Sequence, residues 1–234
     1  MKFNGKVVIV TGGAQGIGKA IKEAFENEGA KVYVIDIQKG NHFIGDVSKK
    51  ADLEKFVDFI LKNENHVDYI INNALPLFKG IDECAYDEFV NALNVGATSV
   101  FYLTKLLRPY LAKDSSIINI TSTRDNQSMP QSESYAAAKG AMKALTHALA
   151  ISLGPNTRVN AIAPGWIDTN NKNYSGSDAN QQPVGRVGTT KDISELVLFL
   201  CSDKASFITG QEFVVDGGMS KLMIYHDEHG WKKE

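Results

Sequence analysis

The stretch KVVIVTGGAQGIG, residues 6–18, decides how this chain folds. It opens with a short run of β-branched residues, which is typical of a strand buried on both faces of a parallel sheet. Apolar residues then recur at helical spacing until Gly29 and Ala30 end the pattern, and residues 31–36 form a second β-branched run. The order of these segments predicts a strand, a helix and a parallel strand joined by a first turn that is rich in glycine.

The glycine-rich turn indicates a nucleotide site. Glycine allows tight turning and close approach of the backbone to phosphate, and the amino terminus of the following helix supplies N–H donors and a positive dipole end. The glycines at 12, 16 and 18 do not match the G-x-G-x-x-G pattern literally, but they stand between a strand and a helix, as that pattern requires.

Asp36 ends the second strand, where its carboxylate can accept hydrogen bonds from an adenosine ribose. A solvated carboxylate at a strand end is the alternative role. Position 37 is Ile and positions 14 and 15 are Ala and Gln, so no Lys or Arg is placed to bind a ribose 2′-phosphate. These residues favour NAD over NADP as the cofactor.

Strand and helix patterns alternate along the rest of the chain, with strands expected at 43–47, 67–71, 117–121 and 157–163 and a long helix at 96–111. We therefore predict an α/β fold, a Rossmann-type doubly wound parallel sheet, in a single domain over residues 1–218. A net charge of −2 gives no basic footprint for nucleic acid, and no stretch reaches the ~18 apolar residues of a membrane span. Two distant cysteines indicate neither a metal site nor a disulfide framework, and we expect a cytoplasmic protein.

Chemistry is suggested by the segment SYAAAK, residues 134–139. Tyr135 and Lys139 are four apart in an alanine-rich helical pattern, which stacks the phenol and the ammonium on one face. A nearby cation favours the phenolate and lowers a pKa that is ordinarily ~10. Ser122 follows the strand at 117–121, at the sheet edge where open α/β folds bind ligands. The alternative is a helix with one exposed Tyr and one exposed Lys.

Taken together, these motifs resemble the short-chain dehydrogenase/reductase family in its compact, single-domain form. The resemblance extends over residues 3–218 and rests on motifs in family order: TGGAQGIG (11–18), Asp36, GDV (45–47), NNA (72–74), the set Ser122, Tyr135 and Lys139, RVNAIAPGWIDT (158–169) and VDGG (215–218).

The resemblance implies a role for each matching position. The pyrophosphate would be held by Gly12, Gln15, Gly16, Ile17 and Gly18, the ribose by Asp36, the adenine by Asp46 and Val47, and the nicotinamide side by Asn73, Ala74, Pro164, Gly165, Ile167 and Thr169. Tyr135 would act as general acid/base. Lys139 would lower its pKa and bind the nicotinamide ribose, and Ser122 would bind the reacting oxygen. A homotetramer or dimer is also implied.

Three departures from the family pattern bear on function. Leu75 follows the NNA motif where the family has Gly, and residues 170–186 form a short polar version of the family's substrate lid. Counting back from Phe101, Gly96 stands where the family carries a helix Asn. Asn94 is two residues away and would face elsewhere unless the helix begins irregularly.

The substrate is predicted from the segment between Ser122 and Tyr135. Its side chains are polar and either border the substrate pocket or form a solvated loop: Arg124, Asp125, Asn126, Gln127 and Glu133. We expect an NAD-dependent oxidoreductase of secondary alcohols or carbonyls acting on a sugar or polyol. A 3-oxoacyl reductase is the alternative substrate class, and a non-catalytic NAD-binding sensor is the alternative from a different class.

Residues 219–234 form a tail after the last predicted strand. It carries several apolar residues, and we expect it to lie at a subunit interface. His226 and His229 in this tail are read as solvated residues, not as metal ligands.

Overall fold

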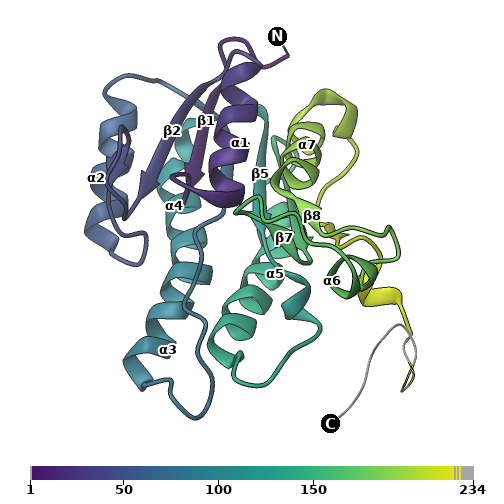
Figure 1. Cartoon of the computed structure of the whole chain (residues 1–234). Helices are drawn as coiled ribbons and strands as arrows, with labels where there is room; N and C mark the ends of the chain where they lie inside the picture. Colours follow the sequence, from purple (N-terminus) through teal and green to yellow (C-terminus); the bar gives the residue numbers. More distant parts are fainter. Residues whose placement is uncertain (1, 224, 226, 228–234) are drawn as a thin grey trace.

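The computed structural model, which describes residues 2–223, 225 and 227, has a seven-stranded parallel sheet with strand order β3-β2-β1-β4-β5-β6-β9 (Figure 1). Helices cover both faces of this sheet, so the predicted doubly wound α/β fold is confirmed. The strands are β1 (Val7–Thr11), β2 (Lys31–Asp36), β3 (Phe43–Ile44), β4 (Val67–Asn72), β5 (Leu111–Ile120), β6 (Thr157–Pro164) and β9 (Glu212–Val215).

The helices divide between the two faces according to which strand side chains they bury. α1 and α7 pack on one face, and α2, α4 and α5 pack on the other. The bounds of the helices are α1 (Gly16–Asn27), α2 (Lys50–Leu61), α3 (Tyr86–Leu93), α4 (Ser99–Leu107), α5 (Glu133–Leu153), α6 (Ser177–Asn180) and α7 (Thr190–Cys201).

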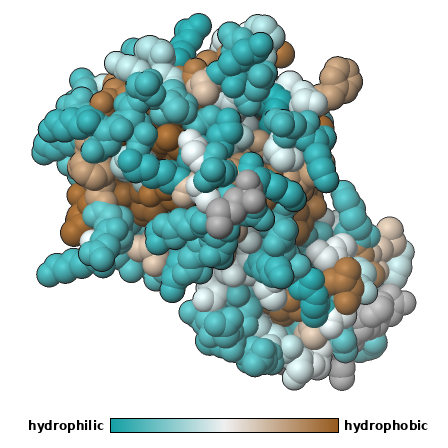
Figure 2. Space-filling view, turned by 90° about the horizontal axis from the view of Figure 1, so that it is seen from above, coloured by the Kyte–Doolittle hydropathy of each residue, from teal (hydrophilic) through white to brown (hydrophobic). Residues whose placement is uncertain are grey.

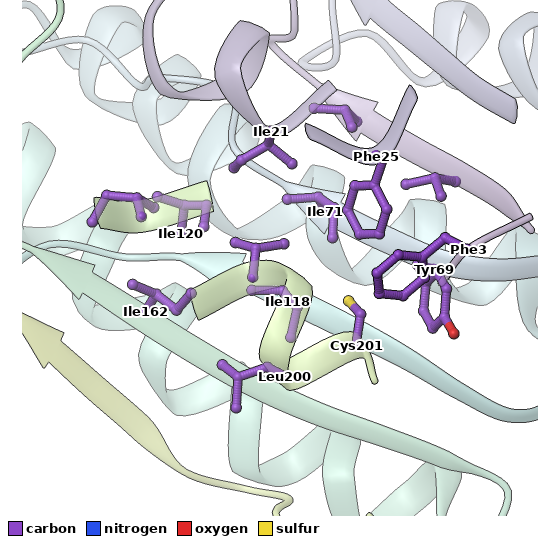
Figure 3. Packing of buried hydrophobic residues seen from close by; sticks show 14 of the residues in the cluster. Phe3, Ile21, Phe25, Tyr69, Ile71, Ile118, Ile120, Ile162, Leu200 and Cys201 are labelled. Carbon is purple, nitrogen blue, oxygen red and sulfur yellow. The ribbon is translucent and has the colours of Figure 1, made fainter. Parts of the chain in front are cut away.

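Strand β1 shows why both faces need a helix layer. All five of its residues are buried, with Val8 and Val10 packing in the cluster under α1 and α7 and Val7 and Ile9 packing in the cluster under α2, α4 and α5. Alternation along a strand sends successive side chains to opposite faces, so a continuous apolar run requires cover on both sides. Figure 3 shows the first cluster, where Phe25 stacks on Tyr69 with ring centroids 5.9 Å apart.

The outer surfaces of the helices carry the polar residues. Seen from above in Figure 2, hydrophilic side chains cover most of the face, and hydrophobic groups emerge between them in several places. This is the pattern expected of amphipathic helices with one apolar stripe toward the sheet.

The strand order reverses at β1, which lies between β2 and β4. The register pairs Thr11 with both Ile35 of β2 and Asn72 of β4, so three carboxyl ends meet at one level of the sheet. Open α/β sheets bind ligands in the crevice at this reversal. The glycine-rich turn and the NNA motif therefore meet where a ligand is expected.

The long helix predicted at 96–111 is wrong in its bounds. The helical segment begins at Tyr86 with α3, passes through a π-helical turn at Asn94–Thr98 and ends with α4 at Leu107. Leu111 already belongs to β5. The extra residue in the π turn shifts the phase of the apolar pattern, which made one irregular element difficult to read from spacing alone.

The strand predicted at 43–47 is also shorter in the structure. It covers Phe43–Ile44 only, because Asp46 accepts a hydrogen bond from the backbone N–H of Ser48 at 2.8 Å and turns the chain toward α2.

The tail begins with a 3-10 turn, Met219–Lys221, in which Ser220 donates its backbone N–H to Asp216 at 2.7 Å. Met223 and Tyr225 are exposed, whereas Ile224, His226, His229 and Trp231 lie outside the described residues. The docking of residues 219–234 at a subunit interface, and the division at residue 218, stay predictions. None of the helices among the described residues is long and apolar enough to cross a membrane.

Two buried or half-buried glycines on facing helical segments give a matched test of this packing. A Cβ added at Gly96 would lie 2.7 Å from the Cβ of Ala138 on α5, whereas one added at Gly140 would meet nothing within 4 Å. We expect Gly96→Ala to destabilise the protein by about 1–3 kcal/mol because the π turn must move away from α5. Gly140→Ala should stabilise it by about 0.4–1 kcal/mol because the unfolded chain loses freedom. Denaturant unfolding followed by circular dichroism measures both changes, and equal stability of Gly96→Ala and the wild type would show that this close contact is unimportant.

Candidate active site

The predicted set Ser122, Tyr135 and Lys139 comes together at the carboxyl end of β5. Ser122 lies two residues beyond the strand and begins a 3-10 turn, Thr123–Asp125, whose Arg124 donates its backbone N–H to Ser122 Oγ at 3.2 Å. The Ser122 hydroxyl lies close enough to Tyr135 to lower the pKa of its phenol, against the effect of burial. The two hydroxyls therefore form a pair that a substrate oxygen can join.

Lys139 lies beneath this pair and is 1% exposed. Its Nζ donates to the carbonyl oxygen of Ile120 at 2.6 Å and lies 5.7 Å from the centroid of the Tyr135 ring. Burial lowers the pKa of Lys139 to about 7, and the negative charge of Asp125 opposes that shift.

Tyr135 differs from the expectation that Lys139 lowers its pKa. Burial raises the pKa of the Tyr135 phenol, while the hydrogen bond from Ser122 and the positive charge of Arg124 work in the opposite direction. The Lys139 ammonium is directed at the carbonyl of Ile120, so the cation that favours the phenolate here is Arg124.

The glycine turn after β1 fits a dinucleotide phosphate. Gly12 and Gly16 have positive φ angles of 67° and 56°, and a Cβ on Gly18 would lie 2.1 Å from the carbonyl oxygen of Gly12. Only glycine permits this backbone path. Gln15 precedes α1 without a side-chain cap and no acid stands in the first turn, so the N–H groups of Gly16, Ile17 and Gly18 are available to an anion.

Asn73 supports the glycine turn, and its predicted contact with the cofactor stays a prediction. Its Nδ2 donates to the carbonyl oxygens of Thr11 at 3.2 Å and Gly12 at 2.8 Å, so this amide positions the glycine turn. The backbone N–H of Ala74 donates to Thr11 Oγ1 at 3.1 Å. The end of β4 thus supports the end of β1 directly.

Asn72, inside β4, has the structural role expected of it. Its Nδ2 donates to Asn119 Oδ1 at 2.8 Å, and Asn119 donates in turn to Thr146 on α5 at 3.0 Å. Each of these buried amides is paired, which removes the cost of burying it in the sheet.

Asp36 is 8% exposed and is held beside the glycine turn. Its carboxylate accepts from the backbone N–H groups of Ala14 and Gln38, both at 2.9 Å. A carboxylate has about four acceptor positions, so capacity remains for ribose hydroxyls. Among the described residues, no cation forms an ion pair with Asp36, and the neighbouring Ile37 is exposed.

The predicted adenine pair lies just after β3. Asp46 forms the turn with Ser48 described above, and Val47 is buried at 7% exposure.

The residues predicted on the nicotinamide side follow β6. Pro164 ends that strand, and Gly165 donates its N–H to the carbonyl of Val215 at 2.9 Å. Ile167 pairs with Gly188 in a small two-stranded sheet, β7 (Ile167–Asp168) and β8 (Gly188–Thr189). The Thr169 side chain lies 3.5 Å from the position of a Cβ on Gly16, so this segment faces the glycine turn.

The lid segment is organised around Asp168. This carboxylate accepts from the backbone N–H of Asn170 at 2.8 Å and of Lys172 at 2.6 Å, and the rings of Trp166 and Tyr174 lie 4.7 Å apart. The start of the short polar lid is therefore a defined turn.

The departure at position 96 has a packing explanation. Gly96 is buried in the π turn, and its close approach to Ala138 leaves no room for the side chain of the family's Asn. The irregularity lies within the helical segment: partly buried Asn94 opens the π turn, and Ser99 donates its hydroxyl to the carbonyl of Val95 at 2.6 Å.

A charged cluster next to the site was missed in the sequence. Lys143 lies one turn beyond Lys139 on α5, with its Nζ 3.5 Å from Asp125 Oδ1 and 2.5 Å from Glu212 Oε2. Thr121 donates to the other oxygen of Glu212 at 2.8 Å. Burial and the hydrogen bond to Glu212 raise the pKa of Asp125 to about 7. The repeated four-residue spacing of Tyr135, Lys139 and Lys143 was the available signal.

The residues that were predicted to line the pocket lie in different environments. Asp125 has a fully buried side chain that joins the charged cluster, and Glu133 accepts the backbone N–H of Ile81 at 3.1 Å. Asn126 and Gln127 are exposed. Arg124 instead lies over the ring of Phe78, 4.9 Å from its centroid, and that ring lies 5.4 Å from Tyr135.

The chain is similar to known oxidoreductases over most of its length. A family model described as enoyl-(acyl carrier protein) reductase matches residues 12–220. An uncharacterized oxidoreductase of Thermotoga maritima is 37% identical, with 96% of this chain and 100% of the relative covered. A 3-oxoacyl-[acyl-carrier-protein] reductase of the same organism is 31% identical, with 94% and 99% covered.

Solved structures agree with the sequence matches. An apo SCOR enzyme from Clostridium thermocellum has a TM-score of 0.92 at 45% identity, with 99% of each chain covered. The aldohexose dehydrogenase of Thermoplasma acidophilum has a TM-score of 0.88 at 30% identity, with 97% of this chain and 98% of that chain covered. A blue fluorescent protein from a metagenomic library, in complex with NADPH, has a TM-score of 0.86 at 26% identity, with 94% and 100% covered. On sequence and structure together, this chain belongs to the short-chain dehydrogenase/reductase family of oxidoreductases.

Proposed function

We propose that this protein is an NAD-dependent oxidoreductase that transfers a hydride between the nicotinamide and a secondary alcohol or carbonyl in a polyhydroxylated substrate. The observation that carries the proposal is the grouping of Ser122 and Tyr135 with the buried Lys139, whose Nζ lies 5.7 Å from the centroid of the Tyr135 ring. This pair follows β5, and β5 neighbours the β4 end that supports the glycine turn.

The cofactor would lie across the carboxyl ends of β1 and β4. The pyrophosphate would be held by Gly12, Gln15, Gly16, Ile17 and Gly18, the adenosine by Asp36, Asp46 and Val47, and the nicotinamide side by Ala74, Pro164, Gly165, Ile167 and Thr169, with Lys139 on its ribose. When bound, the nicotinamide accepts or supplies the hydride.

Proton transfer is assigned to the chain's own residues. During alcohol oxidation, Ser122 holds the substrate oxygen and Tyr135 takes its proton while the carbon loses a hydride. In the reverse direction Tyr135 returns that proton. The pKa of buried Lys139 lies near neutrality, so its charged and neutral forms are close in free energy near pH 7.

Two alternative functions differ from this proposal in what they require of the site. A 3-oxoacyl reductase is favoured by the Thermotoga relative of that name, but its acyl chain would offer no partner to Arg124. A non-catalytic NAD-binding sensor is suggested by the missing helix Asn, but the Ser122–Tyr135 pair argues against it. Homo-oligomeric assembly and a cytoplasmic location stay predictions.

Cofactor choice should depend on Asp36. Its uncompensated carboxylate would repel a 2′-phosphate by several kcal/mol before screening. We expect kcat/KM with NAD to exceed that with NADP by about 100-fold or more. Asp36→Asn keeps the shape of the side chain and should reduce this preference. A wild type that uses both cofactors equally well would contradict the assignment.

Loss of the Tyr135 hydroxyl should stop turnover and spare cofactor binding. Tyr135→Phe removes the transferable proton with little change in volume, so kcat should fall by about 10²–10⁴-fold or more. Binding of NADH, followed by fluorescence, should change little. If Tyr135→Phe turned over at the wild-type rate, the acid/base role would be excluded. A wild type that binds NADH but oxidises or reduces nothing across a broad panel would favour the sensor.

Asp125 in the charged cluster should make the free energy of unfolding fall as the pH rises from about 4 to 7. The pKa of Asp125 is raised in the folded protein to about 7, so the folded state keeps a proton that the unfolded chain releases above pH ~4. This contribution is full at low pH and is lost as pH rises from about 4 to 7. Asp125→Asn resembles the protonated acid and should therefore gain in Tm relative to the wild type between pH 5 and pH 8.

Thermal unfolding of both proteins in matched buffers measures this difference. Glu212, Lys143 and Lys139 are the charged groups around Asp125, so Asp178→Asn in α6 serves as a control outside the cluster. A Tm difference that stays constant over this range would show that Asp125 carries no extra proton.

A further inference from the structure

Arg124 is an unneutralised cation beside the proton-transfer pair. Its backbone N–H donates to Ser122 Oγ at 3.2 Å, which fixes the residue in the turn directly after Ser122. Its guanidinium carbon lies 4.9 Å from the centroid of the Phe78 ring, and that ring lies 5.4 Å from the ring of Tyr135. The Phe78 ring, which is tilted by 43° to the ring of Tyr135, therefore lies in contact with both the guanidinium and the acid/base residue.

The acids that are near Arg124 in the sequence are engaged elsewhere. Asp125 contacts Lys143 and Glu212, and Glu133 accepts the backbone N–H of Ile81. Within the part of the chain that the structure describes, the Arg124 side chain has no ion pair and no hydrogen bond. A guanidinium carries five N–H donors in a fixed fork, and the donors that no protein acceptor occupies are available to a ligand.

Stacking on Phe78 determines what this guanidinium can bind. The guanidinium lies over the ring, and among the described residues no acceptor uses the N–H groups along its edge. That edge matches a carboxylate, which it binds through two parallel hydrogen bonds. A single cation also balances a single negative charge, whereas a dianionic phosphate would leave an excess.

We propose that Arg124 is the specificity-determining residue of this site and binds a carboxylate on the substrate, close to the reacting carbon. The preferred substrates are then hydroxy acids of the sugar-acid type and not neutral sugars or polyols. This inference rests on the proposed function and narrows its substrate class. The reaction converts the hydroxy acid and NAD⁺ into the oxo acid, NADH and a proton. The carbinol carbon gives up the hydride, Tyr135 takes the hydroxyl proton, and the carboxylate is unchanged.

The test compares substrates that differ only in the proposed group. D-Gluconate and D-glucitol share their hydroxyl configuration and differ at one terminal carbon, and D-galactonate and galactitol form a second pair. We measure kcat/KM with NAD for each pair in the wild type, Arg124→Gln and Arg124→Lys. Arg108→Gln is the matched control because exposed Arg108 precedes the same strand, β5, at its opposite end.

The wild type should prefer the acid of at least one pair by about tenfold or more. Arg124→Gln should reduce the acid-to-polyol ratio of kcat/KM by about 10–100-fold, mainly through KM. Arg124→Lys should retain part of the preference because it keeps the charge and loses the fork. Arg108→Gln should keep the wild-type ratio, and matching circular dichroism spectra show that each variant folds.

A binding measurement separates failure of this inference from failure of the proposed function. Gluconate and galactonate are titrated calorimetrically onto the NADH-bound wild type and Arg124→Gln. Weaker binding to the variant supports the carboxylate site even if no turnover is found. Binding of neither acid, unchanged binding in the variant, or tighter binding of D-glucitol 6-phosphate than of gluconate overturns it. Turnover of polyols with no preference for the acids overturns the inference and leaves the oxidoreductase proposal intact.

Discussion

The burial of Lys139 against the carboxyl end of β5 is the constraint on which the site depends. An ammonium that is 1% exposed must find a partner inside the protein, and it donates to the carbonyl of Ile120. That hydrogen bond ties α5 to the last residue of the strand. The same helix carries Tyr135 one turn earlier, so fixing Lys139 also places the phenol beside Ser122. The positions of the reactive side chains thus follow from how one charged residue is accommodated.

Close packing by small residues makes this arrangement possible. Gly96 lets the π turn approach Ala138, the residue that precedes Lys139, and at the other end of the crevice Gly18 lets α1 approach the carbonyl of Gly12. In both places a larger side chain would push a helix away from the end of the sheet. Glycine at position 96 therefore allows α5 to pack closely against the π turn. The turn after β5 in turn holds Ser122, because the backbone N–H of Arg124 donates to the Ser122 hydroxyl.

The sequence was sufficient for the fold because β-branched runs and glycine turns are local signals. The strand at 31–36 was predicted with its observed bounds. Tyr135 and Lys139 were selected by their four-residue spacing and Ser122 by its place after a strand, and the catalytic roles that the family resemblance implies for them stay predictions. Side-chain direction was less accessible. The support that Asn73 gives to the glycine turn was missed, because its partners Thr11 and Gly12 are distant in sequence. The π turn at 94–98 and the pairing of Asp125 with Glu212 likewise depend on contacts that no local pattern encodes.

Charge in this region is divided into two parts with different consequences. The inner part groups one ammonium with two acids, because Lys143 contacts both Asp125 and Glu212, and its charges balance when Asp125, whose pKa is raised to about 7, is protonated. Because Asp125 is engaged in the inner part, it does not act as a counter-ion for the adjacent Arg124. The outer part is therefore the Arg124 guanidinium alone, which lies over the ring of Phe78. A buried ion cluster is a poor source of stability in itself. The effect of the cluster here is to leave Arg124 without a counter-ion near Tyr135. The charge of Arg124 therefore acts on the phenol and on an approaching substrate.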